Sequence, residues 1–282
     1  MSVDLRLGDC LKVMPTLPAE CADMLLTDPP YAVSKDKKNL DRSHWTSAAA
    51  RQRVLVRDFG EWDHFTPEEF AAFMPAWLAE AYRVLRPGAQ CFVFCILEDV
   101  GRLKEWAESA GFQWVMSVLL CKQNPAPQFV GVRQFAYAAE GIGMFRKPGE
   151  PVTWSGTNTM RNWIATPICQ GAERTGHPTQ KPQAILEPLI RLASVPGDTV
   201  LDPFAGSGST LVTAKSLGRH SVGIEGAEKY FRLAQCRLRL REPDDADLAL
   251  LRGRASEEDP GEPVPPLLAL MAAAHAEEEP WS

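Results

Sequence analysis

Short apolar segments alternate with segments of helical periodicity along most of this 282-residue chain. The pattern predicts strands at 5–9, 22–28, 90–96, 112–122, 198–204 and 220–225, and helices at 10–18, 66–86, 98–111, 181–194, 209–218 and 227–241. We expect Pro87 and Gly88 to end the second of these helices. Such alternation is typical of a mainly parallel sheet with helices on both faces. The sequence therefore predicts an α/β, doubly wound fold.

The charge of the chain is unevenly distributed. The net charge is −6, but residues 242–282 hold 11 acidic and 2 basic residues, which leaves 28 basic and 25 acidic residues elsewhere. The mildly basic body permits a polyanionic partner. The acidic tail is rich in Ala and Pro, a composition typical of a disordered segment.

Cysteine usage and hydropathy indicate the compartment. The seven cysteines are scattered and form no CxxC pair, so we expect free thiols and no metal site. No apolar run is long enough to span a membrane, and the first residues lack a secretory signal pattern. We therefore expect a cytoplasmic protein with no membrane partner.

The stretch TDPPY, at 27–31, ends the second predicted strand on a carboxylate, two prolines and an aromatic ring. Proline has no N–H and a fixed φ, so the pair ends the strand and makes the backbone after Asp28 rigid. A generic turn would more often contain Gly or Asn. A rigid strand end of this kind favours a site that holds a flat molecule against Tyr31.

A second strand end, VLDPFAGSGSTLVTA at 200–214, has small residues where a strand turns into a helix. Gly206 and Gly208 would let the backbone approach a ligand. Glu225 ends the next predicted strand, where an acid can accept hydrogen bonds from ribose hydroxyls. The pattern predicts a nucleoside-binding unit, with a merely structural turn as the alternative.

The nucleoside ligand is not predicted to be NAD. Leu211 stands where the dinucleotide fingerprint needs a small residue. Asp202, just before the turn, would lie badly beside a pyrophosphate. A carboxylate there suits a cationic ligand end, such as the amino group of a methionine moiety.

The two motifs together resemble the DNA amino-methyltransferases, which transfer a methyl group from S-adenosyl-L-methionine (AdoMet) to an exocyclic amine of a base. The order, with TDPPY first and the glycine motif last, resembles the β group of that family. GDC at 8–10, KQNPAP…R……E at 122–140, which ends on Arg133 and Glu140, and HPTQKP at 177–182 are further matches. The resemblance covers about residues 3–241 and implies a circularly permuted Rossmann-like methyltransferase fold.

The resemblance also implies how the chain is divided. Residues 1–122 would form a catalytic half that includes a DNA-contacting loop at 32–65. Residues 123–176, rich in Gly, Pro and aromatics, would form an irregular target-recognition insert with short strands. Residues 177–241 would form the AdoMet-binding half, and the tail at 242–282 matches nothing in the family.

The resemblance implies the following catalytic roles. Asp28 and the carbonyl oxygen of Pro29 would accept hydrogen bonds from the target amine, Pro30 would keep that carbonyl rigid, and Tyr31 would stack on the base. The base would have to be flipped out of the duplex to reach them.

The residues implied to contact AdoMet lie in the same motifs. They are Asp9, Cys10, Asp28, His177, Thr179, Gln180, Lys181, Asp202, Phe204, Gly206, Ser207, Gly208, Thr210 and Glu225. Lys181 would pair with the methionine carboxylate, and decoration of the following helix start is its alternative. A surface turn is the alternative for His177, and core packing is the alternative for Cys10.

Basic and aromatic residues mark the segments that would contact double-stranded DNA. They are Lys35, Lys37, Lys38, Arg42, Trp45, Arg51, Arg53, Arg57, Arg133, Arg161 and Trp163. For the basic residues of the loop at 32–65, a solvated charged surface is an equal alternative. Members of the family are often dimers, so a homodimer is also open.

Asp28 favours adenine N6 as the methylated amine. In the subgroup that methylates cytosine N4, Ser usually stands at this position, so cytosine is the alternative. Enzymes of this type that act on RNA or on protein amides usually carry Asn there. A DNA-binding module without catalysis is disfavoured by the intact acid and glycine cradle.

Overall fold

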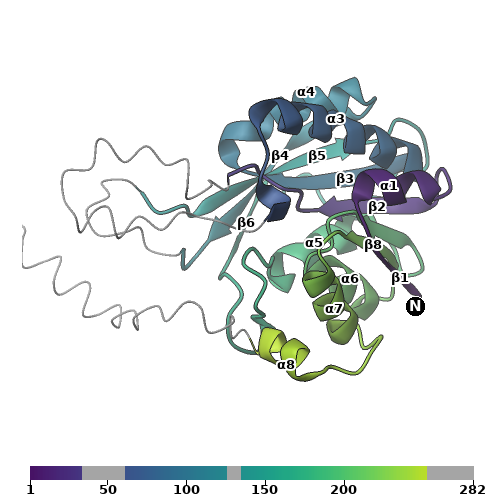
Figure 1. The fold of residues 1–282 in the computed structure, drawn as a ribbon. Helices are drawn as coiled ribbons and strands as arrows, with labels where there is room; N and C mark the ends of the chain where they lie inside the picture. Colours follow the sequence, from purple (N-terminus) through teal and green to yellow (C-terminus); the bar gives the residue numbers. More distant parts are fainter. Residues whose placement is uncertain (34–60, 126–134, 253–282) are drawn as a thin grey trace, which may run out of the picture.

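One eight-stranded sheet organises the described part of the chain (Figure 1). The computed structural model describes residues 1–33, 61–125 and 135–252. The strands are β1 (Val3–Leu7), β2 (Ala22–Thr27), β3 (Leu85–Cys95), β4 (Gln113–Lys122), β5 (Ala139–Arg146), β6 (Trp163–Thr166), β7 (Thr199–Asp202) and β8 (His220–Glu225). Their order is β1-β8-β7-β2-β3-β5-β4-β6. Only β5 of these runs antiparallel to its neighbours, so the predicted mainly parallel sheet is confirmed.

Helices cover both faces of this sheet (Figure 1). They are α1 (Cys10–Val13), α3 (Pro67–Val84), α4 (Val100–Ser109), α5 (Gln183–Ala193), α6 (Ser209–Ser216), α7 (Glu228–Arg237) and α8 (Asp245–Leu251), with 3-10 turns η1 (Met14–Thr16), η3 (Glu61–Asp63), η4 (Leu97–Asp99) and η5 (Gly171–Glu173). On one face α1, α3 and α4 bury Trp77 and Leu103. On the other, α5 and α6 bury Leu186 and Ile190. No helix within the described ranges is both long and apolar enough to cross a membrane.

The order of the strands brings the two motifs together. β8, β7 and β2 are adjacent and parallel, so their carboxyl ends lie at one edge of the sheet. TDPPY follows β2, the glycine turn follows β7, and Glu225 ends β8. Ligands of open α/β sheets bind at this kind of edge.

Helix α3 starts as predicted and ends earlier than predicted. Thr66 and Glu69 exchange the two hydrogen bonds of a capping box at its start. The helix stops at Val84, and β3 begins at the next residue and runs through Pro87 and Gly88. Gly88 has φ +77°, and its N–H donates to the carbonyl oxygen of Lys147 at 2.9 Å. Pro87 and Gly88 therefore lie within β3, where it is hydrogen-bonded to the residue that follows β5.

The insert contains a strand over 139–146, whose bounds and place inside the sheet were not predicted. This segment forms β5, which lies between β3 and β4 and is largely buried. Its glycines allow close packing, because a Cβ at Gly141 would lie 2.6 Å from Val100 and one at Gly143 would lie 2.6 Å from the Phe145 ring. The same glycines interrupt the apolar alternation that would identify a strand.

The acidic tail starts as a helix, which the sequence analysis did not predict. Asp244 and Asp247 form a capping box at the start of α8. Asp247 is only 1% exposed and pairs with Arg232 at 3.2 Å and Arg241 at 2.9 Å. These ion pairs hold α8 near α7. Residues 253–282, to which the expectation of disorder also applies, lie outside the described residues.

Candidate active site

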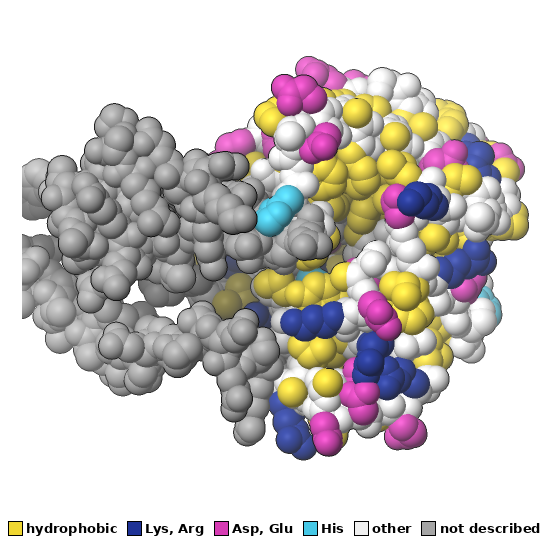
Figure 2. Space-filling model, in the orientation of Figure 1, with side chains coloured by type: hydrophobic (Ala, Val, Ile, Leu, Met, Phe, Trp, Pro, Cys, Tyr) yellow, Lys and Arg dark blue, Asp and Glu magenta, His cyan; other side chains and the backbone are white. Residues whose placement is uncertain are grey.

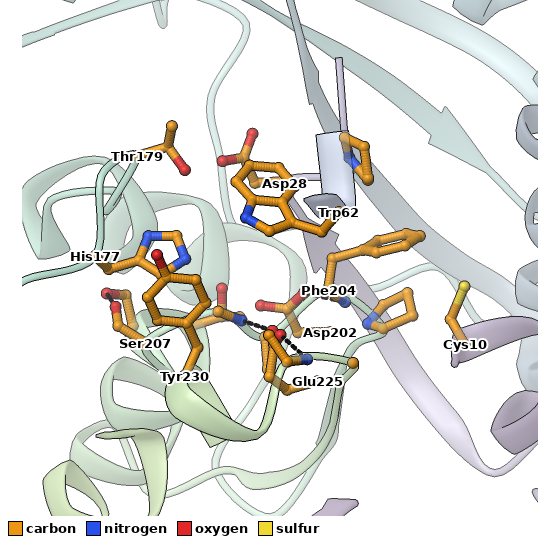
Figure 3. A pocket seen from close by; sticks show the side chains of 18 of the residues that line it. Cys10, Asp28, Trp62, His177, Thr179, Asp202, Phe204, Ser207, Glu225 and Tyr230 are labelled. Carbon is orange, nitrogen blue, oxygen red and sulfur yellow. Dashed lines mark hydrogen bonds between the residues drawn. The ribbon is translucent and has the colours of Figure 1, made fainter. Parts of the chain in front are cut away.

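A pocket of about 640 Å³ opens at the carboxyl ends of β2, β7 and β8. Hydrophobic side chains gather around the hollow in the middle of the face in Figure 2. All residues implied to contact AdoMet line this pocket except Gly208. Sequence motifs from four separate segments therefore meet in one cavity (Figure 3).

The glycine turn forms the floor of the pocket. Gly206 and Gly208 have φ of +53° and +76°, a region that favours glycine, and Gly208 is the N-cap of α6. A Cβ at Gly206 would lie 2.9 Å from His177 Nε2. Arg237 of α7 supports the turn from below, donating to the Ser207 carbonyl at 2.6 Å and to its hydroxyl at 2.9 Å.

Glu225 connects the ends of β7 and β8. Its Oε2 accepts the N–H of Gly206 and its Oε1 accepts the N–H of Ala227, both at 2.7 Å (Figure 3). Burial raises the pKa of this carboxyl, and the backbone donors oppose that shift. Each oxygen keeps a lone pair for a further donor, so the group can accept hydroxyls from a ligand while it fixes the turn.

Asp202 is a buried carboxylate in the pocket wall. Its Oδ1 accepts the Thr27 hydroxyl at 2.6 Å and the Phe204 N–H at 3.1 Å. Burial raises the pKa of Asp202 to about 6, although bonds from Thr27, Thr210 and Phe204 oppose the rise. The group is therefore mostly anionic at neutral pH and suits a ligand cation.

An apolar wall lies beside these carboxylates. The Phe204 ring packs edge-on against Trp77 at 5.2 Å and against Phe73 at 5.9 Å between centroids. Burial raises the pKa of the Cys10 thiol to about 12, so this residue is neutral and packs as an apolar group. Asp9 caps α1 by accepting the Leu11 N–H at 3.0 Å.

His177, from HPTQKP, is buried in the pocket, so the surface turn is excluded. Burial lowers its pKa to about 3, with help from Lys181, so the ring is neutral. It lies 4.3 Å from the Tyr230 ring and 6.5 Å from the Trp62 ring between centroids (Figure 3). Its Nδ1 has no hydrogen-bond partner among the described residues, which leaves one buried polar atom for a ligand.

Gln180 and Thr179 line the same wall. The Gln180 side-chain oxygen accepts the N–H and the hydroxyl of Thr175, at 2.9 and 2.8 Å. Its amide donates to the carbonyl of Glu173 at 2.7 Å. The Gln180 side chain therefore braces the segment that carries His177.

TDPPY places Asp28 at the end of the pocket next to β2. The Asp28 Oδ1 accepts the Tyr31 hydroxyl at 2.5 Å, and Oδ2 pairs with Lys181 Nζ at 2.6 Å. Burial raises the pKa of Asp28, whereas the charge of Lys181 lowers it. The ammonium of Lys181 was expected to pair with the ligand's methionine carboxylate, but it lies on Asp28 and Glu140 instead.

Asp63, in η3, holds the backbone of TDPPY. Its carboxylate accepts the N–H groups of Tyr31 at 2.8 Å, Ala32 at 2.8 Å and Val33 at 3.1 Å. These bonds fix the chain after the two prolines. They also fix Trp62, the neighbouring residue, over the pocket.

Several pocket residues were missing from the sequence-based set. They are Trp62, Phe65, Phe73 and Tyr230, together with the supporting Asp63, Glu140 and Arg237. A sequence signal existed for Trp62 and Phe65, as aromatic residues of the loop at 32–65, and for Glu140, as the end of a motif match. Phe73, Tyr230 and Arg237 lie on α3 and α7, where their patterns are those of ordinary packing.

Most of the expected DNA contacts lie outside the described residues. These are Lys35, Lys37, Lys38, Arg42, Trp45, Arg51, Arg53, Arg57 and Arg133. Arg161 is described, and its guanidinium lies 5.2 Å from the centre of the Trp163 ring. Trp163 is 42% exposed on β6, the edge strand of the sheet.

Comparison with known sequences identifies similar proteins. The family model N6_N4_Mtase, described as DNA methylase, matches residues 22–236. The Type II methyltransferase M.HinfI of Haemophilus influenzae is 32% identical over 262 residues, which are 86% of this chain and 70% of that protein. The Type II methyltransferase M2.DpnII of Streptococcus pneumoniae is 30% identical over 254 residues, which are 82% and 87% of the two proteins.

Solved structures show the same fold. PvuII DNA methyltransferase (cytosine-N4-specific) aligns with a TM-score of 0.67 at 17% identity, over 90% of this chain and 94% of that one. The complex of M1.HpyAVI with SAM aligns with a TM-score of 0.63 at 23% identity, over 84% and 98%. The expected methyltransferase fold is therefore confirmed.

Proposed function

Since this chain belongs to the N6/N4 family of DNA methylases, we propose that it methylates the N6 amine of adenine in double-stranded DNA. The methyl donor is AdoMet. The observation that carries the proposal is the position of Asp28, whose carboxylate lies at one end of the cofactor pocket on a backbone held rigid by Pro29 and Pro30.

The pocket fits AdoMet group by group. Glu225 would accept the ribose hydroxyls, Asp202 would face the methionine ammonium, and the bare Cα of Gly206 leaves room where a Cβ would clash. Phe204 and the neutral Cys10 offer apolar surface to the adenine ring. When bound, AdoMet supplies the electrophilic methyl group.

Asp28 makes the target amine a better nucleophile. The lone pair of an exocyclic amine is delocalised into the ring. If Asp28 accepts one N–H and the Pro29 carbonyl accepts the other, the nitrogen is favoured in a more tetrahedral, nucleophilic state. The carboxylate also stabilises the positive charge that develops on the nitrogen. Because the two prolines fix the carbonyl, little freedom is lost when the base binds.

Adenine is preferred over cytosine because residue 28 is Asp. Cytosine N4 remains the second candidate, since the same two acceptors would serve its amine. A flipped base would enter beside Tyr31, whose hydroxyl is held by Asp28. Stacking on its ring remains a prediction.

We also propose a partner and a location for the reaction. The net positive charge of residues 1–241 and the exposed Arg161–Trp163 pair on β6 suit a DNA backbone and bases. We place the reaction in a bacterial cytoplasm, and a homodimer remains a prediction.

The test is sequencing of DNA from a methylation-deficient bacterium that expresses the chain, with direct detection of modified bases. N6-methyladenine at one short sequence motif is expected, and an expressed Asp28→Ala variant should leave that motif unmodified. N4-methylcytosine instead of N6-methyladenine would establish the second candidate.

A further inference from the structure

Four charges of alternating sign lie in a row that ends at the target-amine site. Lys122 of β4 pairs with Glu140 of β5, with Nζ and Oε1 2.5 Å apart. Glu140 Oε2 lies 3.1 Å from Lys181 Nζ, and this ammonium lies 2.6 Å from Asp28 Oδ2. Residues far apart in the chain therefore form one chain of charges that reaches the catalytic carboxylate.

The ammonium of Lys181 is fully engaged by protein groups. It has three N–H donors, and three acceptors surround it: Asp28 at 2.6 Å, Glu140 at 3.1 Å and the Tyr31 hydroxyl at 3.3 Å. The contact with Glu140 is an ion pair rather than an aligned hydrogen bond. Lys181 is only 9% exposed. Two hydrogen bonds and one ion pair to protein groups therefore hold the ammonium toward Asp28 and Glu140.

We propose that Lys181 is a positioning residue that keeps Asp28 anionic and correctly oriented, and that Glu140 and Lys122 hold Lys181 in that place. This inference rests on the proposed function and deepens it. Glu140 fixes the ammonium from the side opposite Asp28. Lys122 neutralises Glu140, so the charge of Lys181 is available to Asp28.

The charges explain why Lys181 is needed. A buried carboxylate favours its protonated form unless a cation faces it. Glu140 alone would raise the pKa of Asp28 further, and Lys181 opposes both effects. The charges of Lys181 and Lys122 overcome burial and lower the pKa of Glu140 itself to about 2. A protonated Asp28 would be a much weaker acceptor for the amine.

Three other titratable groups face Asp28. Two of them keep their protonation state in the relevant pH range, and the third is present in every variant. Burial raises the pKa of Tyr31 well above its ordinary value and that of Cys95 to about 12, so both stay neutral. Asp202 titrates at about 6. Because Asp202 is present in every variant, differences between pH profiles report on Lys181 and Glu140.

The experiment compares Lys181→Met, Lys181→Arg and Glu140→Gln in the full-length chain. Three quantities are measured: the single-turnover methylation rate against pH, the AdoMet dissociation constant by calorimetry, and the melting temperature. Lys147→Met is the control, because Lys147 is another buried lysine. Its Nζ donates to the Leu85 carbonyl oxygen at 2.8 Å, and it does not line the pocket.

For Lys181→Met we expect the acid limb of the rate profile to move up by at least about 1 pH unit. The rate at neutral pH should fall by about 100-fold, a loss typical for one preorganised electrostatic contact, and the AdoMet dissociation constant should change by less than about threefold. Lys181→Arg should restore part of the rate. Glu140→Gln should lower the plateau rate, and its acid limb should move to lower pH, because an anion near Asp28 is gone.

Opposite shifts of the acid limb cannot arise from a general loss of structure, so they separate positioning from folding. If Lys181→Met or Lys147→Met folds poorly, the direction of the shift in Glu140→Gln still decides the proposal. An AdoMet affinity at least about tenfold weaker in Lys181→Met, with an unchanged pH profile, would overturn it and make Lys181 a cofactor ligand. Failure of the proposed function would be distinguishable, since wild-type protein would then methylate no adenine.

Discussion

The backbone N–H of Gly176 donates to the carbonyl oxygen of Leu250 at 2.7 Å. Gly176 directly precedes His177 in the pocket wall, and Leu250 lies in the last turn of α8. A Cβ on Gly176 would lie 2.9 Å from the Leu250 side chain, so the two segments are in close contact. Helix α8 therefore supports a wall of the cofactor pocket.

The contact predicts that α8 contributes to cofactor affinity. A chain that ends at Glu242 loses Asp247, the partner of Arg232 and Arg241, and frees the segment before His177. We expect this truncation to weaken AdoMet binding by about three- to tenfold. A chain that ends at Arg252 keeps α8 and is the matched control, which should bind as the full chain does. Equal affinities of all three chains in calorimetry would show that α8 does not support the site.

Gly206→Ala should damage the cradle more than a matched glycine replacement elsewhere. Gly171 has φ +54°, nearly the value of +53° at Gly206, but nothing lies within 4 Å of its Cβ position. In both variants an alanine must adopt the left-handed conformation, which costs about 1–2 kcal/mol of stability. Only Gly206→Ala would also push against His177. We expect a loss of AdoMet affinity in Gly206→Ala alone, and an equal loss in both would point to backbone strain as the sole cause.

Glu225→Gln should weaken AdoMet binding by about tenfold, because an amide offers one acceptor where the carboxylate offers two. The Gln NH₂ group would also face the N–H of either Gly206 or Ala227, so one of these backbone donors would lose its partner. The control is Glu228→Gln, at the exposed start of α7. Calorimetry with unchanged affinity in Glu225→Gln would mean that the ribose is bound elsewhere.

AdoMet affinity should fall as the pH is lowered through about 6. Burial raises the pKa of Asp202 to about 6, and a cationic ligand binds better to its anionic form. Binding therefore lowers this pKa, and protons are released on binding near and below that pH. His177 stays neutral in this range because its pKa is about 3. Asp202→Asn should remove the pH dependence between about pH 5 and pH 7, and a retained dependence would assign it to another group.

Site residues that lie within short sequence motifs could be predicted from the sequence. TDPPY and the glycine turn each follow a strand, and parallel strands bring their carboxyl ends to one edge of the sheet. Local chemistry predicted ligand contacts for Asp202 and Glu225, and the family resemblance added Asp28. The parallel strands explain why all three line one pocket.

Residues that act through distant partners were not predictable in the same way. Glu140 ends a motif match, but its role was not predicted, because only β5 places it against Lys122 and Lys181. Short strands were expected in the insert, but the bounds of β5 were not, because two glycines break its apolar pattern. Asp247 belongs to an acidic stretch that resembles a disordered tail, and its order depends on Arg232 and Arg241, which the sequence alone does not bring near it.

Asp28 is proposed to promote methyl transfer from AdoMet to adenine N6. The most direct measurement incubates purified wild-type and Asp28→Ala protein with methyl-labelled AdoMet and duplex DNA, and then separates the nucleosides. We expect label in N6-methyl-2′-deoxyadenosine for the wild type. For Asp28→Ala we expect a rate lower by at least about 1000-fold with the AdoMet affinity largely retained. Label in another nucleoside would contradict adenine as the methylated base, and a comparable rate in Asp28→Ala would contradict the role of Asp28.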